Sequence, residues 1–129
     1  MTDDPIGRAL AERGDVLALE TIGRSTGRPV VVHVGFVRSG DDAFLVAAGS
    51  PAADWVRNLQ VEPRCRVRTG EVDGSYVATE LDGPDRATAI RGLILRYGTP
   101  AERLGAGPAF RLAPTEQLAL EAEELAPEL

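Results

Sequence analysis

The chain has 129 residues, of which 43% are hydrophobic, and it carries a formal net charge of −6 at pH 7. This length suits a single domain, residues 1–129, with a compact core, and the acidic balance disfavours general binding of nucleic acids. No run of about 18 apolar residues occurs, so we expect no membrane span. The acidic, turn-like start lacks the features of a signal peptide, which favours a cytoplasmic protein.

One cysteine, Cys65, cannot form an internal disulfide, and one histidine with one cysteine argues against a zinc site, so we expect no metal. All 14 basic residues are arginine. Residues 24–68 hold seven arginines against four acids, whereas the segments on either side are net acidic. This local positive charge suggests a small anionic ligand rather than a long polyanion, because arginine makes forked contacts with phosphates and carboxylates.

The first predicted element is a short helix within residues 1–14, with Asp4 as its cap, Pro5 at its first position and Gly14 at its end. Alternating apolar residues then predict three strands, the second of which is the strongest in the chain. These strands cover residues 16–21, 30–38 and 43–48, joined by a loop at 23–29 and a turn at 39–42.

In the second half, Ser50 is the predicted cap and Pro51 the first residue of a short helix that runs to about Leu59. Strand patterns follow at residues 64–69, 75–82 and 108–112, with a turn at 70–74. An apolar stripe with helical spacing predicts a helix from Pro84 to Gly98, and residues 115–129 predict an acidic C-terminal helix.

Six short strands joined mostly by tight turns indicate an antiparallel sheet that must curl or close to protect its edges. The chain shows no repeated βαβ alternation, so a Rossmann fold is disfavoured. We therefore predict an α+β protein that is mainly β, with a barrel of about six antiparallel strands at its centre and short flanking helices.

Two connections between predicted elements have the composition of anion sites. The loop from Gly23 to Pro29 offers two glycines, two hydroxyls and two guanidinium groups, which suit phosphate or carboxylate. The second, Ala48 to Pro51, joins a strand to the positive end of a helix. The alternatives are a polar hairpin turn for the first connection and an ordinary capped helix for the second.

Three segments in a specific order and spacing resemble the deazaflavin (coenzyme F-420)-dependent nitroreductase family of actinobacteria. They are TIGRSTGRP at residues 21–29, VGFVRSGD at 34–41 and DWVRNL at 54–59. The resemblance implies a split β-barrel like that of flavin mononucleotide oxidases, and a homodimer. It also implies an oxidoreductase that transfers hydride from the reduced coenzyme to an electron-poor small molecule, namely a quinone, enone, imine or nitro compound.

The resemblance also implies which residues bind the coenzyme. Those near its phosphate and glutamate tail would be Arg24, Ser25, Thr26, Gly27 and Arg28. Those offering backbone groups would be Ala48, Gly49 and Ser50. Those beside it on the short helix would be Trp55, Arg57 and Asn58. Trp55 could instead anchor the core, and Asn58 could instead tie a neighbouring loop.

This chain departs from the family pattern at two positions: Ser25 stands where many members have lysine, and His33 where proline is common. These departures suggest an alternative, in which the coenzyme site is lost and the protein is a binding module or a redox-neutral isomerase or cyclase of a natural-product pathway. Flavin mononucleotide is a third possibility, since the arginine-rich loop suits its phosphate chemically.

Two side chains are candidate catalytic groups. His33 lies in mid-strand, where an imidazole that lines a pocket could give a proton to a reduced substrate. The alternative for His33 is a structural role at a subunit contact. Tyr97 ends the apolar stripe of its helix, and its alternative is core packing.

Arginines at positions 64, 66 and 68 share one face of their strand, opposite Cys65, which we expect to be buried and inert. A hairpin centred on Val72 would place Glu80 near Arg64 and Tyr76 near Arg68. Cross-strand pairing would then account for Arg64 and Arg68 without a ligand, and it leaves the role of Arg66 in this basic stripe open.

Overall fold

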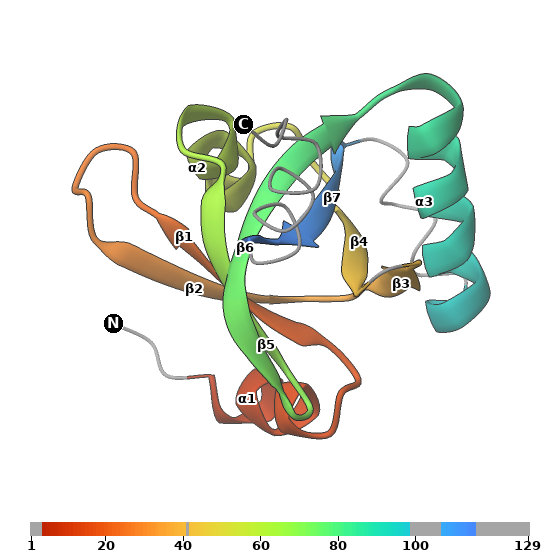
Figure 1. Cartoon of the computed structure of the whole chain (residues 1–129), viewed down its shortest axis with the longest axis horizontal. Helices are drawn as coiled ribbons and strands as arrows, with labels where there is room; N and C mark the ends of the chain where they lie inside the picture. The colour runs from red at the N-terminus through yellow and green to blue at the C-terminus, as the bar shows by residue number, and fades with distance from the viewer. Residues whose placement is uncertain (1–3, 41, 99–106, 116–129) are drawn as a thin grey trace, which may run out of the picture.

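The computed structural model describes residues 4–40, 42–98 and 107–115. In this part of the chain, seven antiparallel strands form one sheet in the spatial order β2-β1-β5-β6-β7-β4-β3, with three helices around it (Figure 1). The strands are β1 Leu17–Ile22, β2 Pro29–Val34, β3 Val37–Ser39, β4 Ala43–Ala47, β5 Arg64–Thr69, β6 Val72–Leu81 and β7 Ala109–Pro114. The helices are α1 Pro5–Glu12, α2 Asp54–Val61 and α3 Gly83–Tyr97.

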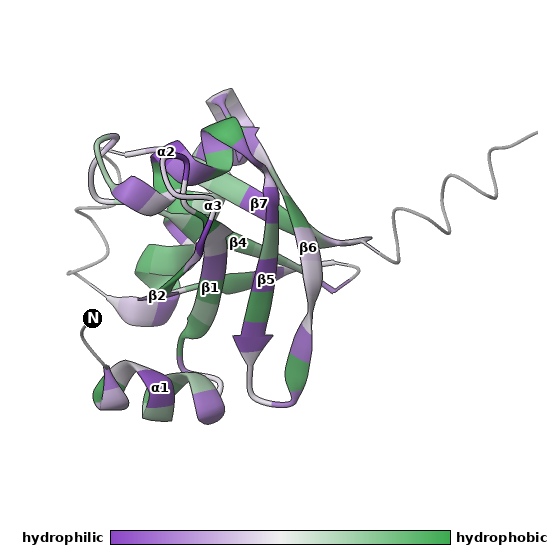
Figure 2. Ribbon diagram, turned by 90° about the vertical axis from the view of Figure 1, so that its left-hand side faces the viewer, coloured by the Kyte–Doolittle hydropathy of each residue, from purple (hydrophilic) through white to green (hydrophobic). Residues whose placement is uncertain are grey.

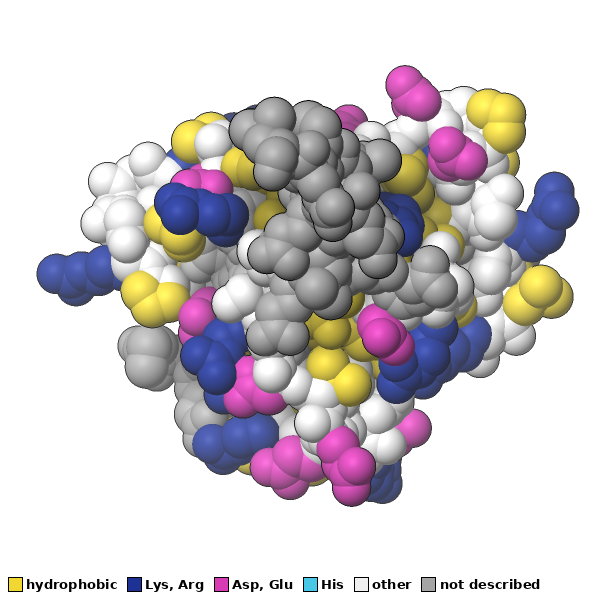
Figure 3. Space-filling view, in the orientation of Figure 1, with side chains coloured by type: hydrophobic (Ala, Val, Ile, Leu, Met, Phe, Trp, Pro, Cys, Tyr) yellow, Lys and Arg dark blue, Asp and Glu magenta, His cyan; other side chains and the backbone are white. Residues whose placement is uncertain are grey.

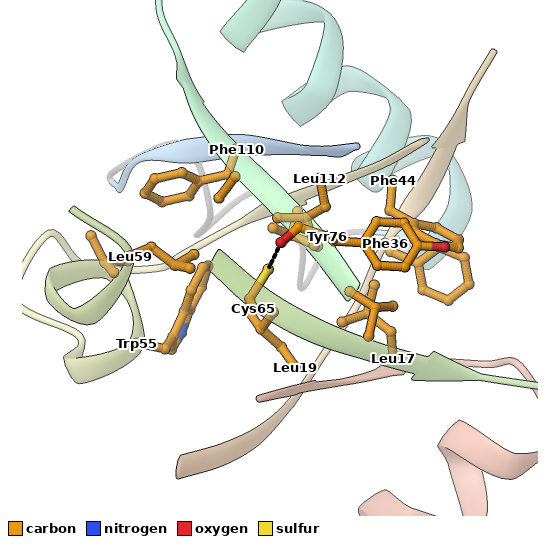
Figure 4. Close-up of a cluster of buried hydrophobic side chains, with 14 of the residues drawn as sticks. Leu17, Leu19, Phe36, Phe44, Trp55, Leu59, Cys65, Tyr76, Phe110 and Leu112 are labelled. Carbon is orange, nitrogen blue, oxygen red and sulfur yellow. Dashed lines mark hydrogen bonds between the residues drawn. The ribbon is translucent and has the colours of Figure 1, made fainter. Parts of the chain in front are cut away.

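The long strand β6 lets the sheet change direction. Its first half pairs with β5 and its second half with β7, and only Tyr76 and Val77 belong to both pairings. The sheet therefore curls around one apolar interior rather than lying flat (Figures 1 and 4). This interior includes the largest fully buried side chains, among them Leu17, Leu19, Phe36, Phe44, Phe110 and Leu112.

Hydrophobic and hydrophilic residues alternate along β5 (Figure 2). The side chains of β5 alternate between the interior and solvent accordingly, as the sequence predicts. Cys65, Val67 and Thr69 are buried, whereas the arginines between them are exposed. Burial raises the pKa of the Cys65 thiol to about 12. The thiol therefore stays protonated near neutral pH and is a poor nucleophile, which agrees with the expected inert role.

The helices occupy three different positions around the barrel. Trp55, Val56 and Leu59 of α2 enter the core, so this helix closes one end of the barrel (Figure 4). The buried face of α3 packs on β4 and β7 through Ala89 and Leu93, and α1 lies near the turn of the β5–β6 hairpin (Figures 1 and 2). In the described residues, no helix has the length and apolar character needed to cross a membrane.

The single strand predicted for residues 30–38 is wrong, because the segment splits into β2 and β3 at opposite edges of the sheet. This break makes seven strands rather than about six. At the break, the Phe36 N–H donates to the Tyr97 hydroxyl (3.0 Å), and Arg96 Nη1 donates to the Phe36 carbonyl (2.8 Å). Helix α3 thus takes the backbone groups that would have continued the strand. A side chain at Gly35 would come within 3.0 Å of the Tyr97 ring.

The hairpin between β5 and β6 has a shorter turn than predicted. Gly70 and Glu71 alone form it, so β6 begins at Val72 and pairs with Thr69. Gly70 has φ of +55°, a conformation that a two-residue hairpin turn requires and glycine adopts readily.

The cross-strand partners expected for the β5 arginines are consequently wrong. Arg64 faces Val77 and Arg68 faces Asp73, rather than Glu80 and Tyr76. Other carboxylates neutralise part of the stripe: Glu62 bonds Arg64 (2.7 Å) and Asp73 bonds Arg66 (2.8 Å).

The ends of the helices follow the predictions in part. Asp4 caps α1 by accepting a hydrogen bond from the Gly7 N–H (2.9 Å), and α3 stops at Gly98, which has φ of +85°. By contrast, α2 begins at Asp54 rather than at Pro51. Ser50 is not its cap, because the Ser50 hydroxyl accepts a bond from Ala52 N (3.1 Å) within a preceding turn.

Two further differences concern the C-terminal part. Strand β7 runs to Pro114, two residues beyond the predicted strand. The helix expected at residues 115–129 lies, beyond Thr115, outside the described residues.

The Tyr97 hydroxyl generates a prediction about stability. This hydroxyl accepts from Phe36 N (3.0 Å) and donates to the Asp15 carbonyl (2.7 Å). Tyr97→Phe should therefore lower the free energy of unfolding by about 1–3 kcal/mol, because the partly buried Phe36 N–H loses its partner and the Asp15 carbonyl loses its donor. Urea denaturation followed by circular dichroism measures this change.

Tyr76→Phe is the matched control, since the Tyr76 hydroxyl makes no hydrogen bond in the described part of the structure while its ring is buried. This control should change stability by about 0.5 kcal/mol or less. Equal losses in the two variants would contradict a special role for Tyr97.

Candidate functional site

The basic loop between β1 and β2 is a tight, internally bonded turn. Gly23 N donates to the Arg28 carbonyl (2.8 Å), and Gly27 N donates to the Gly23 carbonyl (2.8 Å). Arg28 N donates to the Thr26 hydroxyl (3.1 Å). Gly27 has φ of +71°, and a side chain at Gly23 would come within 2.7 Å of the Thr26 hydroxyl. Both glycines are therefore needed for this loop conformation.

Arg24 ties this loop to α2. Its backbone N–H and its Nη1 both donate to Asn58 Oδ1, at 3.2 and 2.8 Å. Its Nη2 lies 3.1 Å from Asp54 Oδ1, and its Nη1 is 3.4 Å from the Asp54 carbonyl. The guanidinium thus contacts three acceptors on one helix, which fixes the position of the loop relative to α2.

Asn58 is the centre of this arrangement. Its side-chain nitrogen donates to the Thr21 hydroxyl (3.1 Å), while its oxygen serves Arg24. Asn58 is 2% exposed and Thr21 is fully buried. A buried amide with both ends bonded joins β1, the loop and α2 into one unit. Of the two roles expected for Asn58, the structure shows the tie to the loop.

The two guanidinium groups of the loop are in different states. Arg24 is 31% exposed and is partly neutralised by Asp54, whose side chain is 82% exposed. Arg28 is exposed, and its guanidinium makes no hydrogen bond or ion pair with any residue that the structure describes. Ser25 and Thr26 are also exposed. An anion at this loop would therefore meet Arg28 first, with hydroxyl groups beside it.

The second connection leads to the same end of α2. Ala48 N donates to the Pro108 carbonyl (2.9 Å), so the chain before β7 covers one side of this connection. Gly49 and Ser50 remain exposed, and Ala53 N lies 3.4 Å from the Ser50 carbonyl in the turn that starts the helix. Since Arg24 touches Asp54, both candidate anion sites meet at the first turn of α2.

The other two helix residues point in different directions. Trp55 is 8% exposed and packs in the core, with its ring centre 5.9 Å from that of Phe110. Arg57 is exposed. The structure thus brings Arg24 and Asn58 into contact, while Trp55 lies on the inner side of the helix.

His33 lines a groove of about 1300 Å³ between α1, β2 and the β5–β6 hairpin. Its Nδ1 lies 3.2 Å from Asp4 Oδ2. Tyr97 does not line this groove, because it lies at the break between β2 and β3 with its hydroxyl between Phe36 and Asp15. The two candidate catalytic groups are therefore in different environments.

Sequence reasoning missed three partners of these residues. Thr21 lies within the matched segment, but nothing in its pattern indicates a bond to Asn58. Asp54 shows only the ordinary signal of an acid in the first turn of a helix. Asp4 is predicted only as a helix cap, and its contact with His33 was missed. The one available signal for that contact is Gly7, because a glycine inside a short helix is unfavourable unless the space is needed.

The surface around the barrel has no field of a single sign on the face shown in Figure 3, where arginines and carboxylates are interspersed outside the grey residues. In the described residues, no group of three or more histidine, cysteine or carboxylate side chains could hold a metal ion.

Several solved proteins are similar to this chain in fold. A solved F420-H2 dependent reductase (FDR-A) has 21% identity over 76% of this chain and 93% of its own, with a TM-score of 0.66. The heme storage protein HutZ from Vibrio cholerae has 23% identity over 88% and 91% of the two chains, also with a TM-score of 0.66. A heme binding protein from Mycobacterium smegmatis has 18% identity over 87% of this chain and 52% of its own, with a TM-score of 0.65.

These solved structures share the split-barrel fold with this chain. None of the curated proteins matches the sequence. A family model supplies the stronger result, because the model described as F420H(2)-dependent quinone reductase matches residues 1–100. The chain therefore belongs to the F420H(2)-dependent quinone reductase family, a family of deazaflavin-dependent reductases.

Proposed function

We propose that this protein binds coenzyme F-420 where the Gly23–Pro29 loop meets the first turn of α2, and that it is an oxidoreductase acting on electron-poor small molecules. Quinones, enones, imines and nitro compounds are the proposed acceptors. The observation that supports this site best is the Arg24–Asn58–Thr21 network, which holds an arginine-rich loop in a fixed place and leaves Arg28 unpaired.

The chemistry of this donor set fits an anionic coenzyme. Arg28 offers a complete guanidinium fork, and the hydroxyls of Ser25 and Thr26 are exposed beside it. The positive end of α2 lies at the same place. Where many family members have lysine, this chain has Ser25, and the unpaired Arg28 supplies a positive charge in the same loop. Ala48, Gly49, Ser50 and Arg57 complete the proposed set of contacts.

When bound in its reduced form, the coenzyme supplies the hydride. The protein residues hold the phosphate and tail, exclude water and provide a proton. His33 is our proposed proton donor, because it lines the groove on β2. We assign Tyr97 to the break between β2 and β3 rather than to catalysis, since its hydroxyl already bonds to two backbone groups.

The protein is further proposed to be a cytoplasmic homodimer. A solved structure with 20% identity and a TM-score of 0.66 is described as a domain-swapped dimer, which supports a second copy as the partner. Heme proteins occur among the structural neighbours. A visible spectrum of the protein, purified from a host that makes the deazaflavin, distinguishes bound coenzyme F-420 from heme, flavin mononucleotide and an empty protein.

The unpaired guanidinium generates the first functional prediction. Arg28→Ala should weaken binding of coenzyme F-420 by about tenfold or more, because a charge-assisted contact to an anion is lost. Titration of the coenzyme's fluorescence with protein measures this affinity.

Arg91→Ala is the matched control, since Arg91 is an exposed arginine on α3 whose side chain has no partner in the described part of the chain. Affinity should be unchanged in this control. An unchanged affinity in Arg28→Ala would remove the loop from the proposed site.

The buried amide generates the second functional prediction. Asn58→Leu keeps the size of the side chain but leaves Arg24 and Thr21 without their partner, so we expect a loss of about 2–4 kcal/mol in the free energy of unfolding. Coenzyme affinity, measured below the unfolding transition, should also fall because the loop is released.

Gln60→Met is the control on the same helix. Gln60 is an exposed amide bonded to Glu80 (3.0 Å), and its loss should change neither quantity by much. If Asn58→Leu kept full coenzyme affinity, the network would be a matter of stability alone.

A further inference from the structure

The groove on β2 has an apolar floor. Val30, Val31 and Val32 line it together with Val72 from the facing hairpin, and of these Val32 and Val72 also pack against the barrel core. Val30 is 39% exposed and Val31 is 42% exposed, so both offer apolar surface on this edge strand. Helix α1 forms one wall and the turn of the β5–β6 hairpin lies beside it (Figures 1 and 2). Such concave apolar surfaces with a few polar groups are typical of small-molecule sites.

One carboxylate holds the imidazole in this groove. Asp4 Oδ1 accepts from Gly7 N (2.9 Å), and Asp4 Oδ2 lies 3.2 Å from His33 Nδ1. A side chain at position 7 would overlap the Asp4 carboxylate and come within 2.6 Å of His33 Nδ1, so only glycine leaves room for this contact. His33 is 16% exposed. A carboxylate accepts only, so Nδ1 carries a proton toward Asp4 and Nε2 is the nitrogen left for another partner.

A second donor stands across the groove floor from His33. Ala18 pairs with His33 on one side and with Arg68 on the other, so these three residues form a row across β2, β1 and β5. The small side chain of Ala18 leaves a gap between two strands that are about 10 Å apart. The Arg68 guanidinium has no hydrogen bond or ion pair in the described part of the structure. An imidazole and a guanidinium thus flank an apolar surface.

The charges of the groove favour a neutral ligand. Asp4 is paired with His33, and Asp73 is paired with Arg66 at 2.8 Å. The other two carboxylates of the groove are matched in number by two arginines: Glu12 and Glu71 against Arg8 and Arg68. The groove lining thus carries charges of both signs rather than a cluster of one sign, which suits a neutral ligand.

We infer that this groove binds the electron acceptor as a neutral, largely apolar carbonyl compound, with its oxygen bonded to His33 Nε2, and that Asp4 is the positioning residue for His33. The redox part rests on the proposed function. When hydride adds to the carbonyl carbon, the π electron pair moves to the oxygen, which takes the Nε2 proton of the imidazolium. The neutral His33 that remains keeps the proton on Nδ1, which donates it in a hydrogen bond to Asp4. Solvent then restores the proton on Nε2. The carbonyl thereby becomes an alcohol.

His33 is the only histidine in the chain, so its imidazole ¹⁵N signals are unambiguous in NMR spectra. The coenzyme-free protein is titrated with 2-cyclohexen-1-one, and with cyclohexene as the matched compound without a carbonyl. We expect a saturable shift of Nε2 with the enone and none with cyclohexene. His33→Leu and Arg68→Met, checked for folding by circular dichroism, should weaken enone binding about fivefold to tenfold, as for one lost hydrogen bond. For these variants the NMR signals of the enone itself report binding, because His33→Leu removes the only imidazole. An unmoved Nε2, or an equal shift with cyclohexene, overturns the assignment.

Asp4→Asn tests the positioning role. Asparagine caps helices as well as aspartate does, so α1 is retained while an amide N–H replaces the acceptor at His33. Neutral His33, observed at alkaline pH, should change from the Nδ1–H tautomer to the Nε2–H tautomer. Glu12→Gln alters another groove carboxylate on α1 and should leave the tautomer unchanged. The same tautomer in Asp4→Asn as in the unchanged protein would overturn the role of Asp4.

The two proposals fail separately. If the coenzyme does not bind but cyclohexenone still shifts Nε2, the reductase function is wrong and the groove remains a carbonyl site. If the coenzyme binds and cyclohexenone leaves Nε2 unmoved, the groove assignment is wrong and the coenzyme site stands.

Discussion

Two residues join the two edge strands of this sheet. Gly35 and Phe36 connect Val34 at the end of β2 to Val37 at the start of β3, three Cα–Cα steps that span about 11 Å at most. In a flat sheet of seven strands, the edges would be about 29 Å apart. The sheet therefore has to curl until its edges meet, and the barrel core follows from this short link. Arg96 and Tyr97 at the end of α3 hold this link through their hydrogen bonds to Phe36, so a helix distant in sequence fixes the two-residue connection.

This closure positions both ends of β2. At its start, the strand follows the basic loop, which the buried Asn58 fastens to the helix that closes the barrel. Four residues further along, His33 faces the groove, a rise of about 13 Å from Pro29. Anion binding and the handling of an acceptor can therefore be separate tasks of one rigid strand, with α2 organising one end and α1 the other.

Sequence patterns predicted the elements that depend on local chemistry. The alternation of β5, the capping of α1 by Asp4 and the end of α3 at Gly98 all follow from residues close in sequence. The break at Gly35 was missed because the apolar alternation continues through it. What breaks the strand is Tyr97, 61 residues away from Phe36. The turn of the β5–β6 hairpin was made too long, since Gly74 suggested a turn but lies within β6.

The candidate site likewise combines residues that the sequence identifies with contacts between distant residues that it does not. Composition and resemblance identified Arg24 and Asn58 as site residues, yet their bond to each other joins positions 34 residues apart and has no local signature. The contacts of this side chain also give a physical reason for arginine at position 24. Arg24 Nη1 reaches Asn58 Oδ1 and the Asp54 carbonyl, and its Nη2 reaches Asp54 Oδ1, a forked arrangement that a single ammonium on a flexible stem cannot match in geometry. Arg24 is thus largely committed to holding the loop. In the proposed function, the charge available to a ligand is then that of Arg28, which stands in for the lysine that many family members have at position 25.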